Sequence, residues 1–248
     1  MKDSVIVSKI KKIREPKDNF REHILLNSYP ARGIVNGKSS LDDSWFILYW
    51  IMGRIDHSRN RRFLVEGPIL RTEPVDLSVV TDPELIIYSA MLELPGKYIV
   101  SNGNQTQTIV DTLKNGGSFD AAVASREREP DAPNYTPRIS GILELSEKPR
   151  IIFNIRKVNL SNSAHTDGVT YWPTVPSPGL GFCLTTYMRD GSPLPSFMGD
   201  PLIVPMEGTP EDVLQTYWDA LDSENRISIA LKHITCVGSS NLMVINRY

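Results

Sequence analysis

The stretch WFILYWIM, residues 45–52, is the longest nearly unbroken apolar run in the chain. Its aromatic and β-branched residues favour a strand, and the lack of charged positions indicates that both faces of this strand are buried. The segment HILLNSYPARGIV (23–35) predicts a partner strand, and the polar NGKSSLDDS (36–44) predicts the turn between them. The run is far shorter than the roughly 18 residues of a membrane span, so we expect no membrane partner.

Short apolar segments elsewhere predict further strands, several of them paired in hairpins. Two segments in the proline-rich region 173–210 are expected at sheet edges, because proline cannot donate to a strand ladder. The further candidate strands are RRFLVEGPIL (61–70), IIYSAMLEL (86–94), KYIVSN (97–102), RISGILEL (138–145), PRIIFNIRKV (149–158), GFCLTTYM (181–188), DPLIVPM (200–206), RISIALKHITCV (226–237) and NLMVINRY (241–248).

Helices are predicted between these strands at TQTIVDTLKN (106–115), SFDAAVASRER (118–128) and EDVLQTYWDAL (211–221). Ser118 and Thr209-Pro210 supply start signals, and Asp82-Pro83-Glu84 reads as one more helix start. Strict alternation of strand and helix is absent, which favours an α+β fold with mostly antiparallel sheets. Residues 1–22 are predicted to form a polar N-terminal extension, and residues 23–248 a single domain.

Composition argues against several classes of function. The 27 basic and 29 acidic residues give a net charge of −2, so a nucleic-acid partner bound through bulk charge is not expected. Cys183 and Cys236 form no CxxC site, and the four histidines lack metal-ligand spacing. No phosphate-binding or dinucleotide-binding glycine motif occurs. We therefore expect no metal and no organic cofactor, and the charged N-terminus, which is no signal peptide, predicts a cytoplasmic protein.

Three polar segments carry groups suited to chemistry, and each also has a purely structural interpretation. Residues 54–62 hold four arginines after the buried strand, where guanidinium groups either bind phosphate or line a solvated turn. The segment VSNGNQT (100–106) offers amides and backbone N–H groups to an anion or a heterocycle, or simply begins a helix. Residues 129–138 set carboxylates, amides and an arginine on a proline-stiffened loop that can hold catalytic groups still.

Taken together and in this order, these segments resemble the archaeal-type IMP cyclohydrolase family. The similarity spans about residues 24–245 and is strongest in the first 140 residues. A longer N-terminus and longer C-terminal loops are similar to a bacterial-looking branch of that family. The residues that carry the resemblance are Tyr29-Pro-Ala-Arg-Gly33, Tyr49 to Arg54 with Ser58-Arg-Asn-Arg61, Tyr88, VSNGNQT (100–106) and Glu129 with NYTPRI (134–139).

The resemblance implies a four-layer αββα sandwich similar to the N-terminal-nucleophile hydrolases. It also implies ring closure of 5-formamidoimidazole-4-carboxamide ribonucleotide to IMP, with no cofactor. Arg61, Tyr88 and Glu129 match positions at the family's reaction centre, with Arg32 nearby. Glu129 would take the carboxamide proton, directly or through a water. Tyr88 would donate to the formyl oxygen or the leaving hydroxyl, and Arg61 would stabilise the oxyanion.

Substrate binding is assigned to the other polar positions of the matching segments. The amides of Asn102 and Asn104 are expected to orient the carboxamide. Arginine side chains are expected to hold the phosphate or the ribose. The full set predicted to bind substrate is Arg54, Arg59, Asn60, Asn102, Gly103, Asn104, Thr106, Asn134, Thr136 and Arg138, with Arg54, Arg59 and Arg138 as the phosphate or ribose ligands.

Two other functions remain open from the sequence. A true N-terminal-nucleophile amidohydrolase would need Ser28 freed by cleavage after Asn27, at the start of the first core strand. A non-catalytic purine-nucleotide-binding protein would keep the arginines and tolerate the loss of Tyr88 and Glu129. Both residues are present, which favours an enzyme.

The oligomeric state has a prediction of its own. The resemblance implies a symmetric homo-oligomer. Trp172, Tyr187 and Phe197, in and beside the proline-rich segment, either form its interface or pack that segment onto the domain.

Overall fold

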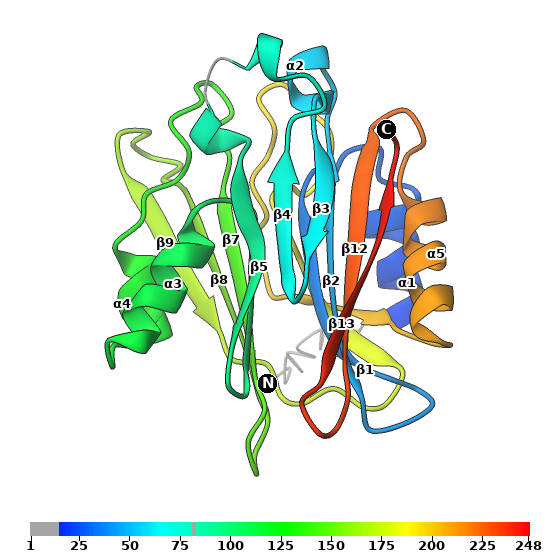
Figure 1. The fold of residues 1–248 in the computed structure, drawn as a ribbon. Coiled ribbons are helices and arrows are strands. Elements are labelled where there is room, and N and C mark those ends of the chain that lie inside the picture. Colours follow the sequence, from blue (N-terminus) through cyan, green and yellow to red (C-terminus); the bar gives the residue numbers. More distant parts are fainter. Residues whose placement is uncertain (1–14, 81–82) are drawn as a thin grey trace, which may run out of the picture.

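Two antiparallel sheets form the body of the molecule in the computed structural model, which describes residues 15–80 and 83–248 (Figure 1). Residues 1–14 of the predicted extension and Asp82 of the predicted helix start lie outside the described residues. All strand pairs within the described part are antiparallel, which confirms the predicted α+β class.

The six-stranded sheet holds the apolar run of residues 45–52 near its centre. Its order is β11 (Leu202–Pro205), β10 (Leu180–Thr185), β1 (Gly33–Lys38), β2 (Trp45–Met52), β12 (Arg226–Ile234) and β13 (Ser240–Asn246). The seven-stranded sheet has the order β3 (Arg62–Glu66), β4 (Ile69–Glu73), β5 (Tyr88–Leu94), β6 (Lys97–Ser101), β7 (Arg138–Glu144), β8 (Arg150–Val158) and β9 (Thr166–Tyr171).

Strand β2 is buried on both faces, as its sequence predicts. Ile47 and Tyr49 pack into the core between the two sheets. Phe46 and Trp50 point the other way, into a core shared with the helices on the outer face. Successive side chains of a strand alternate between faces, so a strand covered on both sides needs an unbroken apolar run.

Helices cover the outer face of each sheet, so the layers run helix, sheet, sheet, helix (Figure 1). On the seven-stranded sheet lie α3 (Gln105–Lys114) and α4 (Phe119–Ala124). On the six-stranded sheet lie α5 (Pro210–Ala220), α1 (Pro16–Phe20) and the π-helical turn Arg21–Leu25. Helix α1 contacts β11, where Asn19 Nδ2 donates to the carbonyl of Ile203 at 2.9 Å. The short α2 (Asp56–Arg59) leads from β2 to β3.

Most predicted elements are confirmed, and their start signals act as expected. Ser118 accepts a hydrogen bond from Ala121 N at the start of α4. Thr209 and Asp212 form a reciprocal capping box at the start of α5. Between β5 and β6, Gly96 has φ +68°, the left-handed conformation that favours glycine in a tight turn.

Some predicted elements are wrong. Residues 23–32 form no strand, because Pro30 has no N–H and Ala31, at φ +59°, turns the chain before β1 begins at Gly33. The segment 61–70 is a hairpin of β3 and β4 rather than one strand, with Gly67 at φ +60° in its turn. The helix predicted to start at Asp82-Pro83-Glu84 is, from Pro83 onward, only a 3-10 turn over Pro83–Leu85.

Two further differences concern strand positions. β10 is not at an edge, because it pairs with β1 on one side and β11 on the other, and no proline interrupts Leu180–Thr185. β9 was not predicted, since this edge strand is half-exposed and polar and lacks apolar alternation.

Of the three aromatic residues considered for an interface, two pack the proline-rich segment onto the domain. Tyr187 and Phe197 are each 1% exposed, whereas Trp172 is 61% exposed. Within residues 15–80 and 83–248, no helix is long and apolar enough to cross a membrane.

Candidate active site

A cleft of about 370 Å³ is lined by segments that connect the strands of both sheets. Residues 29–32 lead into β1, and residues 54–61 follow β2. The loop 129–136 precedes β7, and residues 187–194 follow β10. Segments far apart in the sequence therefore meet at this cleft. Three of the four predicted catalytic residues, Arg32, Arg61 and Glu129, line it.

Two buried guanidinium groups dominate the charge of the cleft. Arg32 and Arg61 are 9% and 6% exposed, and the Nε atom of each is buried with no hydrogen-bond partner among the described residues. Arg61 Nη1 donates to the carbonyl of Leu85 at 3.3 Å. The backbone N–H of Arg32 donates to Thr186 Oγ1 at 3.1 Å, which fixes the strained turn at Ala31. Strain of this kind often accompanies functional groups.

The two arginines have opposite pKa shifts. Burial acts to lower the pKa of Arg32, but the negative charge of Glu129 and the neighbouring tyrosines raise it above the ordinary arginine value. Burial lowers the pKa of Arg61, and the charge of Arg32 lowers it further. Because like charges are held together out of water, the cleft favours an anion or a developing negative charge.

Glu129 is the carboxylate that balances part of this charge. Its backbone N–H donates to the carbonyl of Thr136 at 3.0 Å, and its Oε1 lies 3.9 Å from Arg138 Nη1. Burial raises its pKa, against the opposing pull of Arg32, Arg138 and Arg61. A buried carboxylate with a raised pKa is a stronger base than an exposed one.

Tyr88 lies beside this charged cluster on β5. Its hydroxyl oxygen is 3.0 Å from the hydroxyl oxygen of Tyr49 on β2. Burial raises the pKa of Tyr49 well above its ordinary value, so Tyr49 remains protonated. Tyr88 also lies within electrostatic range of Arg32 and Arg61. The structure thus brings the four predicted catalytic residues into one cluster.

Some of the residues predicted to bind substrate also reach this cleft. Arg54 lies over the ring of Tyr29 at 4.9 Å and forms an ion pair with Asp190. Asn134 Oδ1 accepts a hydrogen bond from Leu194 N at 3.2 Å, and Asn134 and Thr136 both line the cleft. Arg54 is therefore a half-exposed cation at the rim, held in place on one side by a carboxylate.

Arg59 and Asn60 lie elsewhere. Both line a separate hollow of about 240 Å³ beside Val75 and Tyr248. The side-chain amide of Asn60 donates to the carbonyl of Asp76 and accepts from its N–H, each at 2.7 Å. Arg59 Nε donates to the carbonyl of Gly53 at 3.1 Å. The turn of α2 directs these two side chains away from the cleft.

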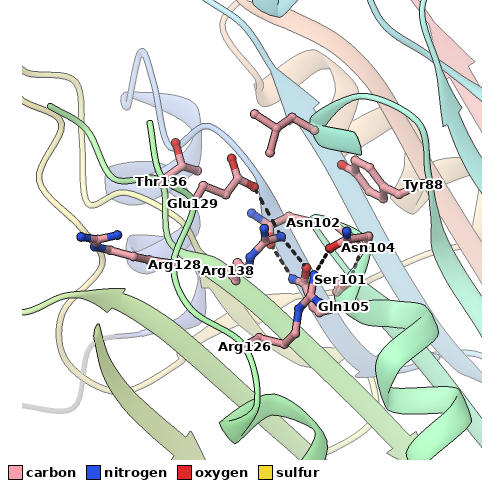
Figure 2. A network of polar contacts seen from close by, with 12 residues as sticks. Tyr88, Ser101, Asn102, Asn104, Gln105, Arg126, Arg128, Glu129, Thr136 and Arg138 are labelled. Carbon is pink, nitrogen blue, oxygen red and sulfur yellow. Dashed lines mark hydrogen bonds and ion pairs between the residues drawn. The ribbon is translucent and has the colours of Figure 1, made fainter. Parts of the chain in front are cut away.

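The turn after β6 serves the architecture of the site. Asn102 Nδ2 donates to the carbonyl of Pro137 at 2.9 Å, and Asn102 Oδ1 accepts from Ile139 N at 2.8 Å. Thr106 Oγ1 donates to the carbonyl of Gly103 at 3.1 Å. Asn104 accepts from Arg126 (Figure 2). Of these predicted binding residues none lines the cleft, and their polar groups bind neighbouring loops.

Arg138 connects this turn to the carboxylate. Figure 2 shows its guanidinium between Glu129 and Gln105, and Nη1 donates to Gln105 Oε1 at 3.0 Å. Its Nε donates to the carbonyl of Glu127 at 2.9 Å. A Cβ on Gly103 would lie 2.6 Å from Arg138 Nη1 and from Gln105 Oε1, so a larger residue there would have to displace the ends of these two side chains. The predicted binding residue Arg138 therefore holds Glu129 in place.

Other residues of the site carry weaker signals in the sequence. Tyr49 lies within a matching segment, but the apolar residues around it predict a core residue rather than a hydrogen-bond partner of Tyr88. Tyr187 and Asp131 also line the cleft. Tyr187 lies within the predicted strand 181–188, where the sequence indicates packing or an interface rather than a place in the site.

The described residues 15–80 and 83–248 contain no group of three His, Cys, Asp or Glu side chains arranged to hold a metal ion. Ser28, the alternative nucleophile, is exposed and lines a different hollow with His23 and Met188. It precedes the first residue of β1, Gly33, rather than starting the strand.

Comparison with known families gives one match. A model described as IMP cyclohydrolase-like protein matches residues 29–238, which includes every residue of the cleft. No curated protein matches the chain significantly.

Proposed function

The chain belongs to the IMP cyclohydrolase-like protein family, and we propose that it closes 5-formamidoimidazole-4-carboxamide ribonucleotide to IMP with loss of water. The observation that carries this proposal is the pairing of one buried carboxylate, Glu129, with two buried guanidinium groups whose Nε atoms have no hydrogen-bond partner in the described part of the chain. Such a set supplies a base and an anion-stabilising pair in one small cleft.

The first step joins the carboxamide nitrogen to the formyl carbon. The amide is a weak nucleophile, so Glu129 accepts one of its protons as the C–N bond forms. The formyl C=O becomes a C–O single bond whose negative charge lies against Arg32 and Arg61. Tyr88 protonates that oxygen and leaves a ring carbon that carries a hydroxyl.

The second step expels water. The former formamide nitrogen gives its proton to the Tyr88 phenolate left by the first step as the C=N bond forms, and the hydroxyl takes up a proton and leaves as water. Glu129, protonated in the first step, is placed to return its proton to the leaving hydroxyl. Burial raises its pKa, which makes the protonated form accessible for this return.

Binding is assigned to the rim of the cleft. Arg54, over Tyr29 and half-exposed, is suited to the ribose phosphate. Arg138 acts through Glu129, and the amides of Asn102 and Asn104 hold the surrounding loops. Arg59 and Asn60 would contact a substrate only if it extended into the neighbouring hollow.

The wider classification follows from the same proposal. The protein would act as a hydrolase-class enzyme of purine nucleotide biosynthesis in the cytoplasm. Residues 23–248 would form one domain, and the helix–sheet–sheet–helix order is in accord with a relationship to N-terminal-nucleophile hydrolases. A symmetric oligomer is expected, for which exposed Trp172 is the remaining interface candidate.

The test is a cyclisation assay with purified protein, the formyl ribonucleotide and a chelator, with IMP measured by chromatography. We expect turnover above about 0.1 per second, lost in both Glu129→Gln and Tyr88→Phe. Glu147→Gln, which alters an exposed turn, is the matched control.

Each other outcome selects another function. Micromolar binding of IMP without turnover would indicate a binding protein, and neither turnover nor binding would remove the purine assignment. An intact mass near 27.8 kDa is expected, whereas loss of residues 1–27 would favour the Ser28 nucleophile.

A further inference from the structure

A chain of hydrogen bonds crosses the cleft from one sheet to the loop that carries Glu129. The hydroxyl oxygens of Tyr187 and Thr136 lie 2.8 Å apart. Thr136 Oγ1 donates to Asp131 Oδ2, and Thr136 N donates to Asp131 Oδ1 at 2.6 Å. The carbonyl of Thr136 accepts the backbone N–H of Glu129 at 3.0 Å. Thr136 therefore links Tyr187 to the backbone of Glu129.

The direction of these bonds identifies the donor. A hydroxyl has one proton, and that of Thr136 is given to the carboxylate of Asp131. Tyr187 must then donate to Thr136. Burial raises the pKa of Tyr187, which keeps that proton in place. The hydroxyl of Tyr187 is occupied by this contact and acts on the loop rather than on a ligand.

The two ends of the contact lie in segments next to strands of different sheets. Tyr187 follows β10 of the six-stranded sheet, while Thr136 precedes β7 of the seven-stranded sheet. Both are almost fully buried, at 1% and 3% exposed. A buried hydrogen bond is costly to leave unmade, so this contact resists separation of the two walls.

The same segment holds the other walls of the cleft. Thr186, the residue before Tyr187, accepts the backbone N–H of Arg32 at 3.1 Å. Leu194 N donates to Asn134 at 3.2 Å, and the ring of Tyr187 stacks on Tyr29 with centroids 6.4 Å apart. Residues 186–194 thus contact the arginine wall and the carboxylate loop together.

We propose that Tyr187 is a positioning residue, which sets the place of Glu129 relative to Arg32 by donating a hydrogen bond to Thr136. This inference rests on the proposed function for its catalytic consequence. That the Tyr187 phenol holds the loop 129–136 in place does not depend on which reaction the protein catalyses.

The experiment compares Tyr187→Phe with Tyr217→Phe in the full chain. Tyr217 is equally buried and donates one hydrogen bond, to the carbonyl of Pro205 at 2.9 Å, in the core on the outer face of the six-stranded sheet. Amide hydrogen exchange of residues 129–136 is expected to speed up about tenfold in Tyr187→Phe, the effect of one lost hydrogen bond. Tyr217→Phe should leave that exchange at the native rate.

Kinetics supply the second readout. Tyr187→Phe should lower kcat about tenfold with KM changed less, because it misplaces a base without removing a ligand. The acid limb of the kcat profile should move to lower pH, since a loosened loop lets water reach Glu129 and lowers its pKa. Thr136→Val cuts the same chain, and adding it to Tyr187→Phe should slow the reaction far less than the product of the two single effects.

The outcomes separate the two proposals. Native exchange of residues 129–136 in Tyr187→Phe, or multiplicative effects in the double variant, would overturn the positioning role. If the native chain does not form IMP, the proposed function fails while the exchange comparison still decides what Tyr187 does. If Tyr187→Phe does not fold, Thr136→Val alone carries the exchange test.

Discussion

The hydroxyl oxygens of Tyr49 and Tyr88 lie 3.0 Å apart and join the two sheets beside the arginine cluster. Tyr49 is fully buried on β2, with no competing hydrogen bond among the described residues. Tyr88 on β5 is in electrostatic range of both arginines. The hydroxyl of Tyr88 is therefore oriented by a partner on the opposite sheet before any substrate binds.

Removal of that partner should weaken catalysis without abolishing it. We expect Tyr49→Phe to lower kcat about tenfold, the effect of one misaligned hydrogen bond, while KM changes little. The control is Tyr171→Phe. Tyr171 is the last residue of β9, and its hydroxyl donates to the carbonyl of Gly199. Steady-state kinetics of both variants decide the matter, and a native kcat in Tyr49→Phe would contradict the orienting role.

The pH dependence of activity should report the carboxylate. Glu129 acts as a base in its ionised form, so kcat is expected to fall as pH drops through its pKa. Burial raises that pKa above the ordinary value of 4.5, which places the acid limb above pH 4.5. A profile of kcat against pH measures this limb. A midpoint at or below 4.5 would mean that the arginines outweigh burial.

The stability of the fold should also depend on Glu129, but it should be highest with Glu129 protonated, whereas catalysis needs the ionised form. The folded state binds the Glu129 proton more tightly than the unfolded state, because burial raises the pKa. Its contribution to stability is therefore full below the unfolded pKa and is lost as pH rises through the folded pKa. We expect the Tm of the native chain, relative to that of Glu129→Gln, to fall as pH rises across this window. If the Tm of the native chain instead rose relative to that of Glu129→Gln as pH rises, the raised pKa would be contradicted.

The arginine pair should destabilise the unliganded fold. Arg61 is buried beside another guanidinium, and its own pKa is lowered by burial and by Arg32. Replacement of a poorly paired buried charge by an apolar chain is often stabilising, so Arg61→Met should raise stability by about 1–2 kcal/mol. The same change should lower kcat on the order of 10²-fold, as expected for an oxyanion-stabilising group. Thermal melting of Arg61→Met without ligand measures the expected gain in stability, and the cyclisation assay measures the expected loss of kcat.

The local sequence pattern predicted much of the fold. Burial on one face gives a strand an alternating apolar pattern, and burial on both faces gives it an unbroken apolar run. The run at β2 and the hairpins β5–β6 and β7–β8 were read correctly for this reason. The position of β10 between β1 and β11 depends on which strands pair, and no local pattern records that choice. The sequence pattern did not predict β9, because a half-exposed polar edge strand has no apolar alternation.

For the site, sequence motifs located the right loops but not the direction in which side chains point. Arg32 and Arg61 face the cleft, while Arg59, in the same motif as Arg61, turns to another hollow. That difference arises from the single turn of α2, which no spacing rule fixes. The role of Tyr187 depends on a contact across 51 residues and two sheets, which one sequence does not display.

Asn102 gives a test that separates binding from architecture. Its side chain donates to the carbonyl of Pro137 and accepts from the N–H of Ile139, and both bonds are buried. Asn102→Ala should therefore lower the free energy of unfolding by about 2–4 kcal/mol, because buried backbone groups lose their partners. Urea denaturation measures this change.

Asn104, two residues further along the same turn, is the comparison. It is partly exposed and its side chain accepts from Arg126, so Asn104→Ala should cost less than about 1 kcal/mol. If Asn102 instead bound the carboxamide of the substrate, its replacement would raise KM and leave stability near the native value. A loss of stability with unchanged KM in the folded fraction means that the turn after β6 acts through Pro137 and Ile139, at the base of the loop that carries Glu129.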